Sequence, residues 1–79
     1  MPAEFLIGSK NPYIGKIVTV TWKRDWGENR VGYTVTGKLK ATYVVNRRTL
    51  IGEVICKYGV KVTCPWSRNF ITIKVHENV

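Results

Sequence analysis

The sequence predicts a small all-β protein, a five-stranded antiparallel barrel, and two features of the residue pattern predict it. Apolar and polar residues alternate with a period of two along most of the chain, which is typical of strands that bury one face. Turn-forming residues interrupt this alternation at short intervals, and no helical segment separates the strands, as parallel strands would require. The 79 residues leave room for one domain, which we expect to span residues 1–79.

The first two predicted strands alternate most regularly. In residues 17–23, three apolar side chains ending with Trp22 face one way, while threonine and lysine face the other. In residues 31–43, Gly37 falls on the apolar row, where a glycine usually marks a bend or bulge at which two backbones approach closely. Such a bend lets a small sheet curl and close on itself. The apolar row is Val31, Tyr33, Val35, Leu39, Ala41 and Tyr43, and the polar row is Thr34, Thr36, Lys38, Lys40 and Thr42.

Three shorter strands complete the predicted sheet. Residues 49–57 carry apolar side chains on both faces, which indicates a central, well-covered strand. The dipeptide Tyr58-Gly59 predicts a hairpin turn. Residues 60–64 then form a fourth strand that Pro65 ends, and residues 70–75 form a fifth.

The N-terminal residues 4–7 are expected to form one turn of helix or an edge strand that Gly8 ends. Five short strands on tight turns in a chain of this length are typical of an SH3-like or OB-type barrel. We take the SH3-like barrel, with a short N-terminal helical turn, as the expected fold.

The charge balance is the strongest indication of function. Lysine and arginine total 13 against 5 acidic residues, which gives a net charge of +8 and a pI near 9.9. A domain pI above about 9 is typical of proteins that bind the phosphate backbone of nucleic acid. Between Glu28 and Glu53, and again between Glu53 and Glu77, the chain carries only basic charges. We therefore predict that the protein binds nucleic acid, although a basic surface can also serve solubility alone.

Three predicted loops combine cations with aromatic rings or amides, which suits RNA or another single strand. Cations follow the phosphates, rings stack on bases, and asparagine reads base edges. Trp22 continues an apolar row and is expected in the core, whereas Trp66 fits the core and a stacking role equally well. The candidate loop residues are Lys23, Arg24, Trp26 and Arg30, then Asn46, Arg47 and Arg48, then Trp66, Arg68 and Asn69.

Two alternatives remain open. The polar row that includes Lys38 and Lys40 can lie along the backbone of duplex DNA, as in a chromatin-type protein. In a structural or protein-interaction domain, by contrast, the charge would serve solubility, and exposed strand edges would pair with other chains. Such edges also lead us to expect a homo-oligomer.

The sequence suggests no enzyme, cofactor or metal site. His76 is the only histidine, the acids are scattered, and neither Ser9 nor Ser67 has a base beside it in a motif. Even with His76, Cys56 and Cys64 provide too few metal ligands for a closed zinc site, and the three residues are poorly spaced for one. With no apolar run near the roughly 18 residues of a membrane helix and no signal-like start, we expect a cytoplasmic protein without a membrane partner.

The two cysteines are expected to be free, buried thiols, with a disulfide as the alternative. In a hairpin that turns at residues 58–59, Cys64 faces Glu53 and Cys56 faces Lys61. The sulfurs are then out of register, whereas a disulfide needs Cα atoms within about 7 Å.

The order of elements resembles that of the Sm and Sm-like RNA-binding proteins, from about Phe5 to Val75. Residues 37–39, Gly-Lys-Leu, are similar to the Gly-x-Leu step in the bent second strand of that family. Tyr43 stands where the family has aspartate, and Arg47 fills the asparagine position that Asn46 precedes.

A second motif is similar as well. Ser67-Arg68-Asn69 is similar to the Arg-Gly-Asn-like turn between the fourth and fifth strands of the family, with the glycine replaced. The resemblance implies a short N-terminal helix before a bent barrel, and a ring of six or seven subunits that binds uridine-rich RNA. By the same resemblance, the pore is lined by Asn46, Arg47, Arg48, Arg68 and Asn69.

Overall fold

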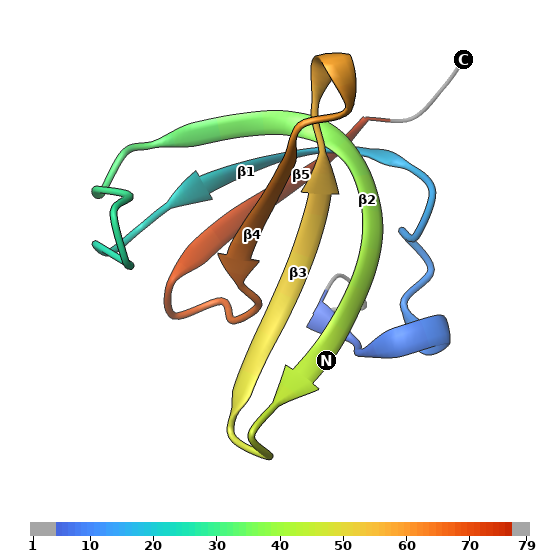
Figure 1. The fold of residues 1–79 in the computed structure, drawn as a ribbon, viewed down its shortest axis with the longest axis horizontal. Helices are drawn as coiled ribbons and strands as arrows, with labels where there is room; N and C mark the ends of the chain where they lie inside the picture. The colour runs from blue at the N-terminus through green and yellow to red at the C-terminus, as the bar shows by residue number, and fades with distance from the viewer. Residues whose placement is uncertain (1–4, 77–79) are drawn as a thin grey trace.

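A computed structural model describes residues 5–76 and confirms an all-β fold of five antiparallel strands (Figure 1). The strands follow one another in a single sheet in the order β4-β3-β2-β1-β5. Two short 3-10 turns, η2 (Gly8–Lys10) and η3 (Lys57–Gly59), accompany them. Glu4, part of the predicted N-terminal turn, lies outside the described residues, and Gly8 begins η2 instead of ending a helix or strand. The strands are β1 (Ile17–Trp22), β2 (Thr34–Val45), β3 (Thr49–Ile55), β4 (Lys61–Pro65) and β5 (Ile71–His76).

The sheet is open between its edge strands β4 and β5, whereas the sequence suggested closure. β5 pairs along its whole length with β1, and β4 pairs only with β3. β4 is short and ends at Pro65, which has no backbone N–H to donate to a further strand. Within residues 5–76 the result is a strongly curled sheet whose β4 and β5 edges have no strand partner.

β2 is the longest strand, and its curvature allows one sheet to wrap around the core (Figure 1). The bend predicted at Gly37 is confirmed by a close backbone approach. A Cβ atom at that position would lie 2.8 Å from the carbonyl carbon of Ile55 and nearer still to its oxygen. Only glycine therefore fits where β2 crosses the end of β3.

A bulge in β2 changes the predicted alternation. The register with β3 shifts between Leu39 and Ala41, so the alternation reverses after Lys40. Thr42, expected on the polar row, is consequently 3% exposed. Its hydroxyl accepts the N–H of Gly8 at 2.7 Å and donates to the carbonyl of Leu6 at 3.2 Å, which fastens the N-terminal segment to β2.

The core lies on the inner side of the curled sheet and includes Trp22, as predicted. The predicted apolar row of the second strand is wrong at its start, because β2 begins only at Thr34 and leaves Val31 and Tyr33 exposed. Val60, expected in the fourth strand, is likewise exposed because it follows η3. The buried apolar residues of the main cluster are Val18, Val20, Trp22, Val35, Leu39, Val54, Cys64, Trp66 and Ile71.

The pairing of β3 with β4 explains why both cysteines are free. Cys64 lies opposite Gly52, one residue from the expected partner, and the N–H of Cys56 donates to the carbonyl of Val60 at 2.7 Å. The two residues are therefore far out of register across the hairpin. Cys64 is buried, and burial raises the pKa of its thiol to about 12, whereas Cys56 is partly exposed.

Candidate nucleic-acid interface

Two loops that are distant in the sequence meet at one end of the sheet. Because β1 pairs with β5 as far as Trp22 and Ile71, the residues after β1 lie beside the residues before β5. The backbone N–H of Lys23 donates to the carbonyl of Phe70 at 2.6 Å, and its Nζ donates to the carbonyl of Arg68 at 2.8 Å. We call Lys23, Arg24, Arg68 and Asn69 the loop cluster.

Phe70 adds an aromatic ring to this cluster that alternation alone does not predict, because the sequence pattern places Phe70 in the fifth strand, whereas β5 begins at Ile71. The guanidinium carbon of Arg24 lies 5.8 Å from the centre of the Phe70 ring, within the range of a cation–π interaction. The ring is half-buried and holds Arg24 next to the loop that carries Arg68. Three cations and a ring thus gather at the ends of β1 and β5.

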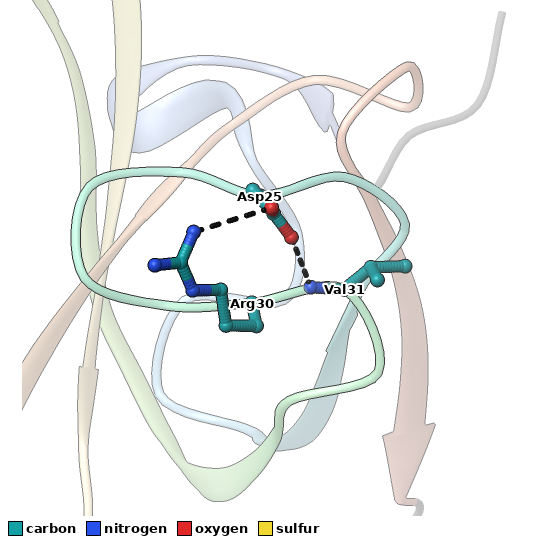
Figure 2. Close-up of polar contacts among 3 residues, drawn as sticks. All are labelled: Asp25, Arg30 and Val31. Carbon is teal, nitrogen blue, oxygen red and sulfur yellow. Dashed lines mark hydrogen bonds and ion pairs between the residues drawn. The ribbon is translucent and has the colours of Figure 1, made fainter.

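Asp25 organises the loop between β1 and β2 (Figure 2). Its Oδ1 accepts the backbone N–H of Val31 at 2.7 Å, and its Oδ2 lies 3.4 Å from Nη1 of Arg30. The two side chains of this ion pair are 54% and 78% exposed, so the pair contributes little to stability. Its main effect is that Arg30, a predicted binding residue, is partly neutralised by a neighbouring carboxylate.

Trp26 is less available than expected for a ring at a loop tip. It forms an isolated bridge with Asn29, with N–H to carbonyl distances of 2.8 and 2.9 Å in the two directions. The indole is half-buried and packs against the core cluster. Only part of the Trp26 ring can therefore contact a ligand.

Trp66 is fully buried, which assigns this predicted binding residue to the core. Its ring packs against the backbone of Gly52, where a Cβ atom would lie 2.8 Å from Cζ3 of the indole. On another side lies Phe5, whose ring centre is 5.6 Å away. A base cannot stack on an indole enclosed in this way.

A pocket of about 510 Å³ opens between the N-terminal segment, the start of β3 and the β4–β5 loop. Its walls are mostly apolar, and the β4–β5 loop adds polar groups, among them Arg68 and Asn69 of the loop cluster. Trp66, which has no surface exposed to solvent, forms the floor of the pocket. No pattern in the sequence predicts the pocket, because its apolar residues come from three separate segments. The lining residues are Phe5, Leu6, Leu50, Trp66, Ser67, Arg68 and Asn69.

The turn between β2 and β3 projects at the lower end of the view in Figure 1 and presents the predicted residues Asn46, Arg47 and Arg48. All three are exposed, and Asn46 and Arg47 have φ angles of 53° and 63°. The left-handed region costs a residue such as arginine about 1 kcal/mol or more, although asparagine tolerates it. The turn therefore holds Arg47 in solvent in a conformation that glycine would adopt more easily.

Lys38 and Lys40 are both exposed on β2, away from the loop cluster. Lys38 lies opposite Ile17 of β1 and Ile55 of β3, whereas Lys40 sits at the bulge. Apart from Trp26 and Arg30 in the β1–β2 loop and the buried Trp66, the predicted binding residues therefore form three groups: the loop cluster beside the pocket, the β2–β3 turn, and the lysines on the strand wall.

Comparisons with family models, curated proteins and solved structures found no match for this chain. Among residues 5–76, no helix has the length and apolar character needed to cross a bilayer. What the protein binds therefore has to be inferred from its own residues and their arrangement.

Proposed function

We propose that this protein binds RNA or another single-stranded nucleic acid and catalyses no reaction. The observation that carries the proposal is the loop cluster, in which Lys23 and Arg24 after β1 lie beside the loop before β5 that carries Arg68, itself a lining residue of the pocket. Such convergence places several cations within reach of neighbouring phosphates, and each phosphate contact releases counterions and strengthens binding.

The pocket supports a single strand over a duplex. Its volume of about 510 Å³ falls within the usual range for small-ligand sites, and its apolar walls suit the face of an unstacked base. Asn69 offers an amide donor and acceptor for a base edge, and Arg68 offers a cation for the adjoining phosphate. Bases inside a duplex stay stacked and cannot enter such a pocket.

We further propose that the sheet is an SH3-like barrel of the Sm type and that the protein forms a homo-oligomer. The return of β5 to β1 and the bend at Gly37 support the barrel. The unpaired edges of β4 and β5 support pairing between copies. Light scattering of the purified chain tests this assembly, and a monomeric mass at high concentration would contradict it.

The binding proposal is tested by titrating single-stranded RNA, single-stranded DNA and duplex DNA at several salt concentrations. Affinity for single strands should fall with a log–log slope of about 0.7 per phosphate contact. The double variant Arg24→Ala/Arg68→Ala should weaken single-strand binding at least about tenfold, the equivalent of 1.4 kcal/mol.

The matched control is Lys10→Ala/Lys57→Ala, which removes the same charge from two exposed residues of η2 and η3, outside the cluster. It should change the affinity by less than about threefold, since scattered charges contribute only to the general potential. Equal losses in both variants, or binding that does not respond to salt, would favour a protein-interaction domain instead.

A further inference from the structure

The outer face of the β5–β1–β2 half of the sheet is a regular array of hydroxyls and cations. Antiparallel partners that lie directly opposite point to the same side of a sheet, so the register assigns three cross-strand rows to this face. The central residues of the rows are Ile17, Thr19 and Thr21 of β1. We call the array the hydroxyl face: His76–Ile17–Lys38, Lys74–Thr19–Thr36 and Thr72–Thr21–Thr34.

The hydroxyls of this face bond to one another. Oγ1 of Thr19 lies 2.8 Å from that of Thr36 and 2.6 Å from Nε2 of His76, and Oγ1 of Thr21 lies 3.2 Å from that of Thr34. A threonine hydroxyl has one hydrogen and two acceptor lone pairs. Thr34 donates its hydrogen to the carbonyl of Gly32 at 3.2 Å, so Thr21 donates to Thr34 and this pair has no O–H to spare. The Thr19–Thr36 pair keeps one O–H for an outside acceptor when Nε2 of His76 donates to Thr19. These bonds hold the hydroxyl oxygens of the face in fixed positions.

The charges on the two halves of the sheet differ. The hydroxyl face carries Lys38 and Lys74 and no carboxylate. On the β2–β3–β4 half, Glu53 accepts the hydroxyl of Tyr43 at 2.7 Å and lies 3.8 Å from Nζ of Lys61. A polyanion therefore meets two cations without a compensating carboxylate on the hydroxyl face, whereas on the other half Glu53 offsets the charge of Lys61.

We propose that the hydroxyl face binds the sugar–phosphate backbone of double-helical nucleic acid, independently of base sequence. Lysine and threonine side chains are common donors to phosphate oxygens. Their spacing is repetitive, about 4.8 Å between strands and about 6.7 Å between alternate residues along a strand. Among the described residues, the face holds no Phe, Tyr, Trp or amide side chain, and Nε2 of its one imidazole, His76, is bonded to Thr19 at 2.6 Å, so we expect no sequence-specific base contacts. This surface goes beyond the proposed single-strand site and uses none of its residues.

The experiment compares two charge-matched double variants by fluorescence anisotropy. Lys38→Ala/Lys74→Ala removes both cations of the hydroxyl face, and Lys10→Ala/Lys57→Ala serves again as the control. Each variant is titrated with a 20-base-pair duplex DNA, a 20-base-pair duplex RNA and a 20-nucleotide single strand. The better duplex identifies whether DNA or RNA is the ligand.

The face variant should bind duplex about tenfold or more weakly than the wild type. Its log–log slope of affinity against salt concentration should fall by nearly two, at about 0.9 per lost phosphate contact. Its single-strand affinity should match that of the control. Thr36→Val/Thr72→Val removes two hydroxyls of the face, keeps the branched shape, and should weaken duplex binding about threefold at an unchanged melting temperature.

The proposal is overturned if the face variant and the control lose the same duplex affinity, or if the face variant loses single-strand and duplex affinity equally. A wild-type protein that binds single strands but no duplex would refute the hydroxyl face alone. Loss of single-strand binding in Arg24→Ala/Arg68→Ala tests the loop site separately, so the two proposals fail independently.

Discussion

Replacing Gly37 with alanine should destabilise the protein more than the same replacement at any other exposed or half-buried glycine among the described residues. The new Cβ would lie 2.8 Å from the carbonyl carbon of Ile55 and 2.9 Å from Cγ1 of Val54. Two of its three nearest neighbours belong to the backbone of β3, which cannot rotate away as a side chain can. The strand crossing itself must therefore widen.

The expected loss follows from two opposing terms. Overpacking in a well-packed site costs about 1–3 kcal/mol, and a clash with backbone belongs at the upper end of that range. Against this, alanine restricts the unfolded chain and contributes about 0.4–1 kcal/mol of stability. The net loss is about 2–2.5 kcal/mol, which lowers the melting temperature of a domain of this size by roughly 8–20 °C.

Thermal unfolding followed by circular dichroism measures this loss directly. Gly59→Ala is the control, because its Cβ would meet no atom within 4 Å while its φ of +74° still disfavours alanine. That variant should lose about 1 kcal/mol from backbone strain alone. A melting temperature for Gly37→Ala within about 3 °C of the wild type, or equal to that of Gly59→Ala, would refute the close crossing of β2 and β3.

Three further predictions concern the loops and the thiols. Arg47→Gly should raise the free energy of unfolding by about 1 kcal/mol, because glycine adopts the left-handed turn without strain. The same variant should weaken nucleic-acid binding. A lower melting temperature would contradict the turn geometry. Asp25→Ala should cost about 1 kcal/mol in chemical denaturation, since the N–H of Val31 loses its 2.7 Å acceptor. Burial raises the pKa of Cys64 to about 12, so iodoacetamide at pH 8 should modify Cys56 first and Cys64 only after unfolding, as mass spectrometry would show. Rapid labelling of both thiols in the native protein would contradict that burial.

Much of the strand pattern could be predicted because alternation directly reflects which face is buried. Trp22 continues a regular apolar row and is in the core, and Gly37 marks a true bend. Thr42 could not be predicted, because its inward position depends on a bulge that adds a residue against β3. A bulge of this kind has no marker in the sequence when the extra residue is a lysine.

The site was harder to predict than the strands, since it depends on contacts between distant segments. Trp66 lies beyond Pro65, where alternation no longer indicates a face, and its burial follows from the space that Gly52 leaves for its ring. Lys23 and Arg68 meet only because β1 pairs with β5. Single-residue reasoning identified the charged residues and missed their grouping.

The pairing of β1 with β5 also constrains how the chain reaches its native state. These strands come from opposite ends of the described sequence, so their contacts close a long loop and raise the contact order. During synthesis, β1 to β4 emerge first, and the free side of β1 stays an unsatisfied edge until the last strand leaves the ribosome. Over that interval β1 is open to pairing with another chain. A chain truncated by removal of residues 71–76 would keep this edge of β1 unpaired, so we expect it to aggregate.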